Sequence, residues 1–366
     1  MLMKNAVKIV GAGVVGLILA KLLAGKGIPT SVYEQKRRIG YPVKASGILS
    51  IKGINGLGIG YKKTIENELY GARLHIGKML LSARSEKPVA YALDRLRLNE
   101  ICYDEALRAG AKVELGRRLS QGEIEGFAGN DIVVGADGAV SMVAKAFGFP
   151  PISRHVLTYR AEYSADVDDT RTVEIFVNKS ITPGFFGWVA PIAKDRIEVA
   201  VGIDSKHGNS KAAFEKFVRI GEVAKILENA ELLSAEASMI PLALRRNFVD
   251  ERNRVLLVGD AAGQTKPSTG GGIIFGGNAA IIAAGVISKY IAGDCKLIDY
   301  QREWLHKFGT DLRMHKLIRW AYSNLSTGAL SFLASALKAL GIEDFLSKNG
   351  DMDSPAYMLK KALHIR

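Results

Sequence analysis

The chain has 366 residues, of which 48% are hydrophobic, so it can bury a full core, which we expect to form two interleaved domains. The formal net charge is +13 and the mean hydropathy is slightly positive, at +0.09. These values leave open a basic solvated surface, an anionic membrane contact and a phosphorylated substrate, but without a nucleic-acid motif we expect no nucleic-acid partner.

The first 34 residues have the pattern of a dinucleotide-binding unit. Residues 7–10 form an apolar run, residues 14–24 have helical spacing, and residues 30–33 form a second strand that ends at Glu34. A glycine-rich turn, residues 11–16, joins the first strand to the helix and is called the first glycine loop below. This strand, turn, helix and strand predict a bound dinucleotide.

At each of its three positions in this loop, glycine is favoured for a physical reason. Gly11 allows a tight turn, Gly13 allows the backbone to approach a pyrophosphate, and Gly16 lets the helix pack closely on the strand. Glu34 lies where its carboxylate can accept hydrogen bonds from ribose hydroxyls.

The next hundred residues alternate between strand and helix patterns. Residues 73–93 predict two or three strands, residues 97–109 a helix, and residues 112–115 a short strand. Residues 131–138 predict a buried strand that meets a turn, with Ser141 as the cap of the following helix.

The middle of the chain has a different texture. Residues 172–177, 184–192 and 197–203 predict strands of a separate antiparallel sheet, and residues 210–229 predict a helix among them. We therefore expect a discontinuous cofactor domain and an inserted sheet domain, followed by a helical region that ends in an apolar stretch at residues 317–346. The expected domains are residues 1–150 with 244–295, residues 151–243, and residues 296–366.

A second glycine loop, residues 259–272, follows a buried apolar run and has the sequence Gly-Asp-Ala-Ala-Gly-Gln-Thr-Lys-Pro-Ser-Thr-Gly-Gly-Gly. It opens a long apolar segment, so it ends at a helix N-terminus, where free amides attract anions or electron-rich carbonyls. FAD is long enough to need one loop at each end, which explains both loops. Three consecutive glycines remove side chains where a flat ring lies against backbone.

These segments resemble a known superfamily. Residues 131–138 and 259–272 are similar to the second and third fingerprints of the FAD-dependent monooxygenases and reductases that include para-hydroxybenzoate hydroxylase. The form of the second glycine loop, residues 40–47 (Gly-Tyr-Pro-Val-Lys-Ala-Ser-Gly) and Arg95 at a helix start resemble the geranylgeranyl reductase family, in particular archaeal digeranylgeranylglycerophospholipid reductases.

The resemblance implies an α/β fold: a Rossmann-like FAD-binding domain (GR2 type) with an inserted antiparallel β-sheet substrate domain and a helical C-terminal region. It also implies a set of FAD-binding residues. Asp260 would hold a ribityl or ribose hydroxyl, with helix capping as the alternative, and Arg95 would reach the pyrophosphate or adenosine unless it is an exposed helix-start arginine. The full set is Gly11, Ala12, Gly13, Val15, Gly16, Glu34, Ala45, Ser46, Gly47, Arg95, Leu119, Asp260, Gly271, Gly272 and Ile273.

On the substrate side, residues 186–191 resemble an aromatic-x-Trp motif of the family. Phe186 and Trp188 would guide an isoprenoid chain over the flavin, and the alternative is a Trp-centred sheet core. The chain departs from the family pattern in three places: Ala45 replaces a cysteine, Ala190 a phenylalanine and Asp204 a second glycine.

No metal site or conventional catalytic group is expected. Cys102 and Cys295 belong to no CxxC or His-rich cluster, which argues against a zinc site or a disulfide framework and fits a reducing, cytoplasmic compartment. The six histidines have no metal or triad spacing. No residue is identified as catalytic, because flavin chemistry is carried by the cofactor.

By resemblance, the chain is expected to be an FAD-dependent reductase of C=C bonds in a geranylgeranyl-type lipid. The partners would be that isoprenoid lipid and an external electron donor, NAD(P)H or ferredoxin, with peripheral contact to an anionic membrane left open. Two alternatives remain: an FAD-dependent monooxygenase of an aromatic or apolar substrate, and a non-catalytic lipid-binding protein that contains FAD.

Overall fold

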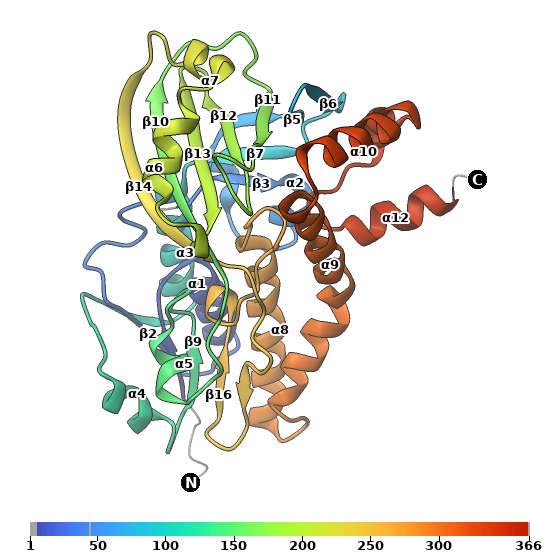
Figure 1. Ribbon diagram of the computed structural model, residues 1–366. Helices are drawn as coiled ribbons and strands as arrows, with labels where there is room; N and C mark the ends of the chain where they lie inside the picture. The colour runs from blue at the N-terminus through green and yellow to red at the C-terminus, as the bar shows by residue number, and fades with distance from the viewer. Residues whose placement is uncertain (1–5, 44, 365–366) are drawn as a thin grey trace.

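The computed structural model describes residues 6–43 and 45–364, and the side chains of all of these except residue 364. Two large sheets lie one above the other, and long helices flank both on one side (Figure 1). The expected fold class is confirmed: a parallel α/β domain, an antiparallel sheet and a helical C-terminal region are all present.

The lower sheet of Figure 1 has six strands in the order β15-β16-β9-β1-β2-β8, and only β15 is antiparallel to its neighbour. Its strands are β1 (Val7–Val10), β2 (Thr30–Glu34), β8 (Lys112–Leu115), β9 (Ile132–Gly135), β15 (Val249–Asp250) and β16 (Val255–Leu257). Every residue of β9 and β16 is buried, as is typical of a parallel strand covered on both faces. Because β1 and β2 are parallel, the first glycine loop and Glu34 lie at the same sheet edge.

Five helices accompany this sheet. They are α1 (Val14–Ala24), α3 (Arg95–Arg108), α4 (Gln121–Phe127), α5 (Met142–Ala146) and α8 (Ile273–Ala292). The predicted strand at 7–10 and helix at 14–24 are confirmed with the predicted bounds, and Ser141 caps α5 as expected, accepting a hydrogen bond from the Ala144 amide at 3.0 Å.

Helix α8 is the central helix of the core. It is long and apolar enough to cross a membrane by length and composition, a feature that the sequence patterns above did not predict. However, about half of it is buried inside the protein, where it packs on α1 through Gly276 and Val15. It therefore has the burial of a core helix.

The upper sheet has seven strands in the order β14-β10-β13-β12-β11-β5-β6. The strands are β5 (Gly71–Ile76), β6 (Met79–Arg84), β10 (His155–Ser164), β11 (Thr172–Val177), β12 (Gly187–Ala193), β13 (Arg196–Asp204) and β14 (Glu231–Pro241). All pairs are antiparallel except β11 with β5. The upper sheet thus includes β5 and β6, which lie outside residues 151–243 in the chain. The domain boundaries at 150, 243 and 295 stay a prediction.

The helix predicted over residues 210–229 is wrong as a single element. The structure has α6 (Ser210–Phe217) and α7 (Gly221–Ile226), because the backbone leaves helical geometry at Ile220, which caps α7 in an extended conformation. Phe214 and Phe217 of α6 pack on the sheet in its main apolar cluster.

A third, small sheet has the order β3-β7-β4. Its strand β7, together with β5 and β6 of the upper sheet, accounts for the strands predicted over residues 73–93. Its strands are β3 (Ile48–Ser50), β4 (Ile65–Leu69) and β7 (Ala90–Leu93), next to α2 (Ile51–Asn55) and a 3-10 turn at Tyr61–Thr64. Further 3-10 turns cover Ser205–His207 and Gly259–Ala261.

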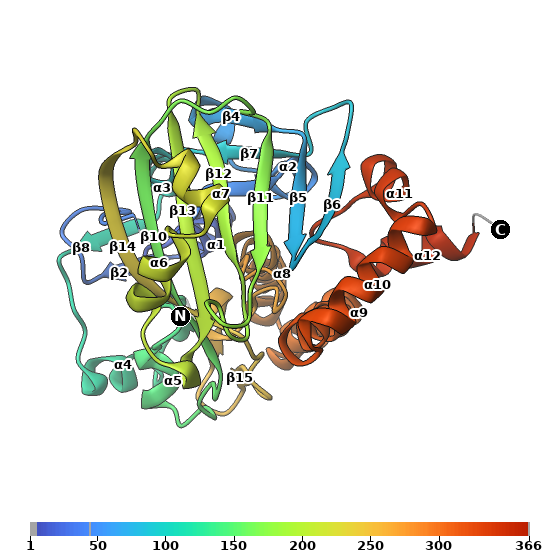
Figure 2. The ribbon, with the colours of Figure 1, turned by 45° about the horizontal axis from the view of Figure 1, so that its top comes forward.

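The C-terminal region is helical, as expected, but the apolar stretch at 317–346 is divided. The helices are α9 (Ile298–Asn324), α10 (Thr327–Ala339), α11 (Ile342–Asn349) and α12 (Pro355–His364). Ser326 caps α10, and Gly341, with φ +77°, separates α10 from α11. Figure 2 shows α10 and α11 beside β5 and β6, at the edge of the upper sheet.

Candidate cofactor and active site

The first glycine loop has the close packing that its spacing predicts. Gly11 has φ +105°, and a Cβ atom there would lie 2.4 Å from the Ala136 carbonyl oxygen. A Cβ on Gly16 would lie 2.2 Å from the Gly11 carbonyl oxygen. By contrast, a Cβ on Gly13 would meet nothing within 4 Å. Gly11 and Gly16 are therefore required by the fold, whereas Gly13 borders open space where a ligand can approach.

Glu34 is fixed at the end of β2 by backbone groups. Its Oε2 accepts from the Ala12 amide at 2.9 Å, and its Oε1 accepts from the Lys36 amide at 2.9 Å. The carboxylate thus connects the first glycine loop to the neighbouring strand, and its free lone pairs face the space that a ribose would occupy.

A cavity of about 320 Å³ opens at this edge of the lower sheet. Six of the predicted cofactor residues line it: Ala12, Gly13, Glu34, Ala45, Arg95 and Asp260. Five further lining residues were absent from the predicted set: Lys36, Gly40, Pro42, Val43 and Asn99. The structure therefore brings together side chains from the first glycine loop, the 40–47 segment, α3 and the second glycine loop.

Arg95 is the least satisfied polar group in this cavity. Its Nε and Nη1 atoms are buried and have no hydrogen-bond partner among the described residues. Burial lowers the pKa of the guanidinium to about 10. A buried, unpaired guanidinium is costly, and a bound phosphate would supply the missing acceptors and the countercharge.

Asp260 connects the cavity to the start of α8. Burial raises the pKa of its carboxyl to about 6. A Cβ on Gly272 would lie 2.7 Å from Asp260 Oδ1, so the three-glycine run passes directly over this carboxyl. Gly272 gives α8 no side-chain cap, which leaves the first amides of a 20-residue helix available to an electron-rich group.

The second glycine loop is held from behind by the C-terminal region. Lys266 Nζ donates to Asp353 Oδ1 at 2.6 Å, and the Ser268 hydroxyl bonds His315 Nδ1 at 2.6 Å. Tyr322 donates to the Ser268 carbonyl oxygen at 2.9 Å. His315, one of the six histidines without metal or triad spacing, is buried in this network. Burial, and then the charge of Lys266, lowers the pKa of His315 to about 4.

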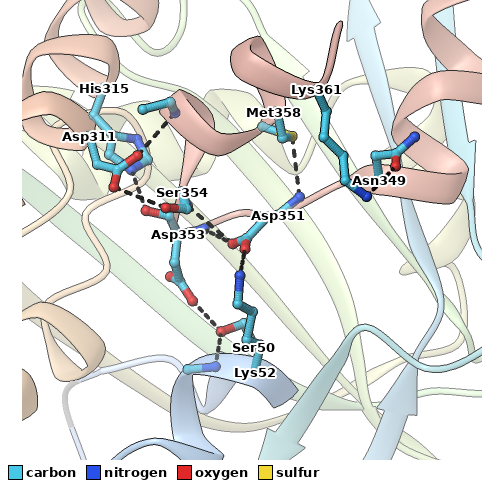
Figure 3. A network of polar contacts seen from close by, with 12 residues as sticks. Ser50, Lys52, Asp311, His315, Asn349, Asp351, Asp353, Ser354, Met358 and Lys361 are labelled. Atoms are coloured by element: carbon cyan, nitrogen blue, oxygen red, sulfur yellow. Dashed lines mark hydrogen bonds and ion pairs between the residues drawn. The ribbon is translucent and has the colours of Figure 1, made fainter. Parts of the chain in front are cut away.

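Figure 3 shows the neighbouring contacts of two of these residues, His315 and Asp353, from close by. Asp353 lies between His315 and Ser50 there, so a single turn of chain, residues 350–354, connects α9 to the start of α2. Asp351 of the same turn pairs with Lys52 at 2.7 Å. We call residues 350–354 the C-terminal turn below.

The predicted substrate residues lie in an aromatic cluster on the upper sheet. Phe186 stacks on Phe185 with ring centroids 4.3 Å apart, and Trp188 and Tyr322 complete the cluster at 5.7 and 6.3 Å from Phe186. Tyr322 bonds Ser268, and a Cβ on Gly270 would lie 3.5 Å from Phe185, so the cluster contacts the second glycine loop directly. Trp188 Nε1 donates to the buried Glu198 at 2.7 Å, which fixes the indole in the sheet.

The three departures from the family pattern differ in their surroundings. Ala45 lines the cavity, and Ala190 is buried in β12. Asp204 is buried and pairs with Arg154 at 2.7 Å and Arg319 at 3.3 Å. Since Arg319 also donates to the Pro267 carbonyl oxygen, Asp204 joins the upper sheet to α9 and to the second glycine loop.

The remaining predicted residues lie outside the cavity. Val15 packs between Gly259 and Gly276, and Ser46 accepts from the Ile48 amide at 3.4 Å. Gly47 is in close contact with Leu93, and Leu119 is buried in the main core. Gly271, Gly272 and Ile273 form the junction of the second glycine loop with α8. Lys44, in the 40–47 segment, is outside the described residues.

No group of three or more His, Cys, Asp or Glu side chains that could hold a metal ion occurs within the described residues. Cys102 and Cys295 are both free thiols. The polar groups of the site are instead those that a dinucleotide requires: a carboxylate for a ribose, an unpaired guanidinium for a phosphate, and an uncapped helix start. These residues fit FAD.

Comparisons with known proteins agree with this geometry. The FAD binding domain family matches residues 4–296. An uncharacterized protein of Methanocaldococcus jannaschii is 30% identical over 98% of this chain and 94% of its own length. A digeranylgeranylglycerophospholipid reductase of Methanothrix thermoacetophila is 26% identical over 92% of both chains.

Among solved structures, a geranylgeranyl bacteriochlorophyll reductase-like protein of Thermoplasma acidophilum superimposes with a TM-score of 0.81. The match covers 97% of this chain and 94% of the other, with 21% identity. This likeness shows a shared fold along almost the whole chain.

Proposed function

Because this chain belongs to the FAD binding domain family and binds FAD, we propose that it is a reductase of C=C bonds in geranylgeranyl chains of isoprenoid or ether-lipid precursors. Support comes from the relative in Methanothrix thermoacetophila, a digeranylgeranylglycerophospholipid reductase that aligns along 92% of the chain. That this chain is a flavoprotein oxidoreductase follows from its family. What we propose beyond that is the lipid substrate.

The observation that carries the proposal is the contact between the aromatic cluster and the second glycine loop. Phe185 and Tyr322 touch that loop from the upper sheet and from α9. The loop contains Asp260 and ends at the start of α8, where the resemblance puts the flavin ring. An alkene chain lying along Phe186 would therefore be next to the reacting end of the cofactor site.

FAD supplies the hydride when it is bound, and the chain's own residues prepare the site. Arg95 provides positive charge and hydrogen-bond donors for a pyrophosphate, and Glu34 and Asp260 provide acceptors for hydroxyl groups. The first amides of α8 stabilise negative charge at the ring. The buried Lys266, Ser268 and His315 close the back of the loop and keep water out.

The reducing equivalents would come from an external donor, NAD(P)H or ferredoxin. This part of the proposal rests on chemistry alone, since alkene reduction consumes two electrons for each double bond and FAD must be reduced again after each turnover.

Anaerobic turnover tests the proposal. The holoprotein is reduced with dithionite and mixed with a geranylgeranyl lipid, and the mass of the product is measured by mass spectrometry. We expect a gain of about 2 mass units per double bond, and a rate at least about tenfold lower for Phe186→Ala than for the surface control Leu232→Ala. In a parallel reaction with oxygen, an oxygen-dependent gain of about 16 mass units would support the monooxygenase alternative instead. Unchanged lipid with FAD still bound would support lipid binding without catalysis.

A further inference from the structure

The C-terminal helices have an exposed apolar face. Along α10 and its C-cap residue Leu340, the apolar residues that recur at spacings of three and four are all exposed: Ala329, Phe332, Leu333, Ala336, Leu337 and Leu340. Phe332 is 77% exposed and Leu340 is 83% exposed. The packed side of α10 is mixed: Leu330 and Ala334 are buried in an apolar cluster with residues of β5 and β6, and the Ser331 hydroxyl donates to the Ile76 carbonyl oxygen at 3.1 Å. A surface helix with only one packed face normally carries charges on the other.

Two other C-terminal helices, α9 and α12, also carry exposed apolar side chains. Leu317, Ile318 and Trp320 are exposed on the last turns of α9, and Tyr357, Leu359 and Leu363 are exposed on α12. Figures 1 and 2 both show α10 and α12 on the same side of the molecule, away from the lower sheet. We call the exposed apolar residues of α9, α10 and α12 the C-terminal apolar face.

Basic and aromatic side chains border this face. Arg313 and Lys316 are exposed within two turns of Trp320, and Lys360 and Lys361 are exposed beside Tyr357. Acidic residues are also present, since Glu343 and Asp344 begin α11, but Glu343 is paired with Lys338 at 3.3 Å and accepts from the Ser82 amide. Trp and Tyr with flanking Lys and Arg are typical of helices at a membrane interface.

We propose that the C-terminal apolar face docks on an anionic lipid bilayer. The net charge of +13 attracts an anionic bilayer, whereas two copies of the same basic chain repel each other. Apolar side chains on α10 enter the acyl boundary, and the bordering cations pair with lipid phosphates.

The packed side of α10 contacts the aromatic cluster. Leu330 and Ala334 of α10 belong to one apolar cluster with Phe186 and Tyr322. A docked protein thus has its aromatic cluster one helix away from the lipid phase. Delivery of a lipid by this route rests on the proposed function, whereas docking is measured without turnover, so the two proposals fail separately.

Flotation of the holoprotein with vesicles tests docking. We expect at least about tenfold more binding to phosphatidylcholine vesicles containing phosphatidylglycerol than to phosphatidylcholine alone, and a decrease in high salt. The double variant Phe332→Glu/Leu340→Glu should bind the vesicles with phosphatidylglycerol at least about tenfold more weakly than the wild type. The matched control Val140→Glu/Leu232→Glu makes the same charge change at exposed apolar positions of other elements, and should stay within about twofold.

A second measurement does not depend on that double variant folding. Of the three tryptophans, Trp320 is exposed, Trp304 is buried, and Trp188 is half-buried with its indole bonded to Glu198. Brominated anionic lipids should therefore quench mainly Trp320, and Trp320→Phe should remove most of the quenching. Equal binding to both vesicle types, or no binding, overturns the proposal. So does a concentration-dependent dimer that Phe332→Glu/Leu340→Glu dissociates without any vesicle binding, because the face would then cover a second copy.

Discussion

Lys266 Nζ lies 2.6 Å from Asp353 Oδ1, although 87 residues separate the two in the chain. The Lys266 side chain is 5% exposed and the Asp353 side chain is 13% exposed, so this is a buried ion pair. It is formed by the second glycine loop and the C-terminal turn. The position of the loop that borders α8 therefore depends on a segment near the end of the chain.

Removing one partner of this pair should be costly. In Asp353→Ala the Lys266 ammonium stays buried without a countercharge, and we expect a loss of about 3 kcal/mol in the free energy of unfolding, with faster hydrogen exchange over residues 350–364. Urea unfolding and exchange mass spectrometry measure both.

The matched control is Lys52→Ala, which breaks an ion pair to Asp351 of the same C-terminal turn. Because Lys52 is 72% exposed, the loss should stay below about 1 kcal/mol. The double variant Lys266→Met/Asp353→Leu removes both charges and should regain most of the stability. If Asp353→Ala and Lys52→Ala lowered the free energy of unfolding equally, the buried Lys266–Asp353 pair would contribute no more to stability than the exposed one.

Arg95→Met should have opposite effects on the two forms of the protein. Without FAD, it removes a buried, unpaired charge, and the free energy of unfolding should rise by about 1 kcal/mol. With FAD, it removes a charged donor, and the dissociation constant should rise about 10- to 100-fold. Fluorescence titration of the apoprotein measures the affinity.

The control is Arg97→Ala, two residues further along α3 at an exposed position. Its dissociation constant for FAD should change by no more than about twofold, and its free energy of unfolding by no more than about 0.5 kcal/mol. If Arg95→Met bound FAD as tightly as this control, Arg95 would have no part in the cofactor site.

Two glycines of the same loop should respond differently to alanine. Gly13→Ala adds a methyl group to open space, so the free energy of unfolding of the apoprotein should change by less than about 1 kcal/mol, while FAD affinity falls at least about tenfold. Gly16→Ala drives a methyl group against the Gly11 carbonyl and should cost about 1–3 kcal/mol of stability. Parallel unfolding and titration curves compare them, and unchanged FAD binding in Gly13→Ala would contradict the assigned approach of the pyrophosphate.

His315 should make stability depend on pH. Its pKa is lowered in the folded protein from 6.5 to about 4, so the unfolded chain binds a proton that the folded chain does not. The stabilisation is complete above pH 6.5 and decreases as the pH falls toward 4, by on the order of 3 kcal/mol. The stability difference between the wild type and His315→Gln should therefore shrink by that amount between pH 7 and pH 4. A difference that is constant with pH would mean that His315 titrates normally.

Local patterns in the sequence predicted the first glycine loop and its flanking elements well. The strand at 7–10 and the helix at 14–24 have their predicted bounds, because buried apolar runs and glycine spacing are signals that a short segment carries alone. Arg95 at the start of α3 came from the family resemblance, and the structure finds it in the cavity.

Contacts between distant segments had no such signal. Strands β5 and β6 alternate as strands should, but a period of two does not tell which sheet a strand joins, and they join the upper one. Asn99 and Lys36 line the cavity without any motif that marks them. His315 has the appearance of an ordinary helical residue in the sequence, and only the packing of α9 brings it to Ser268.

The C-terminal turn has a consequence for the order in which the protein matures. Residues 350–354 are synthesised after both glycine loops. Until they are made, Lys266 and Ser50 lack the Asp353 carboxylate that joins them. The contacts behind the second glycine loop therefore form later than the loop itself.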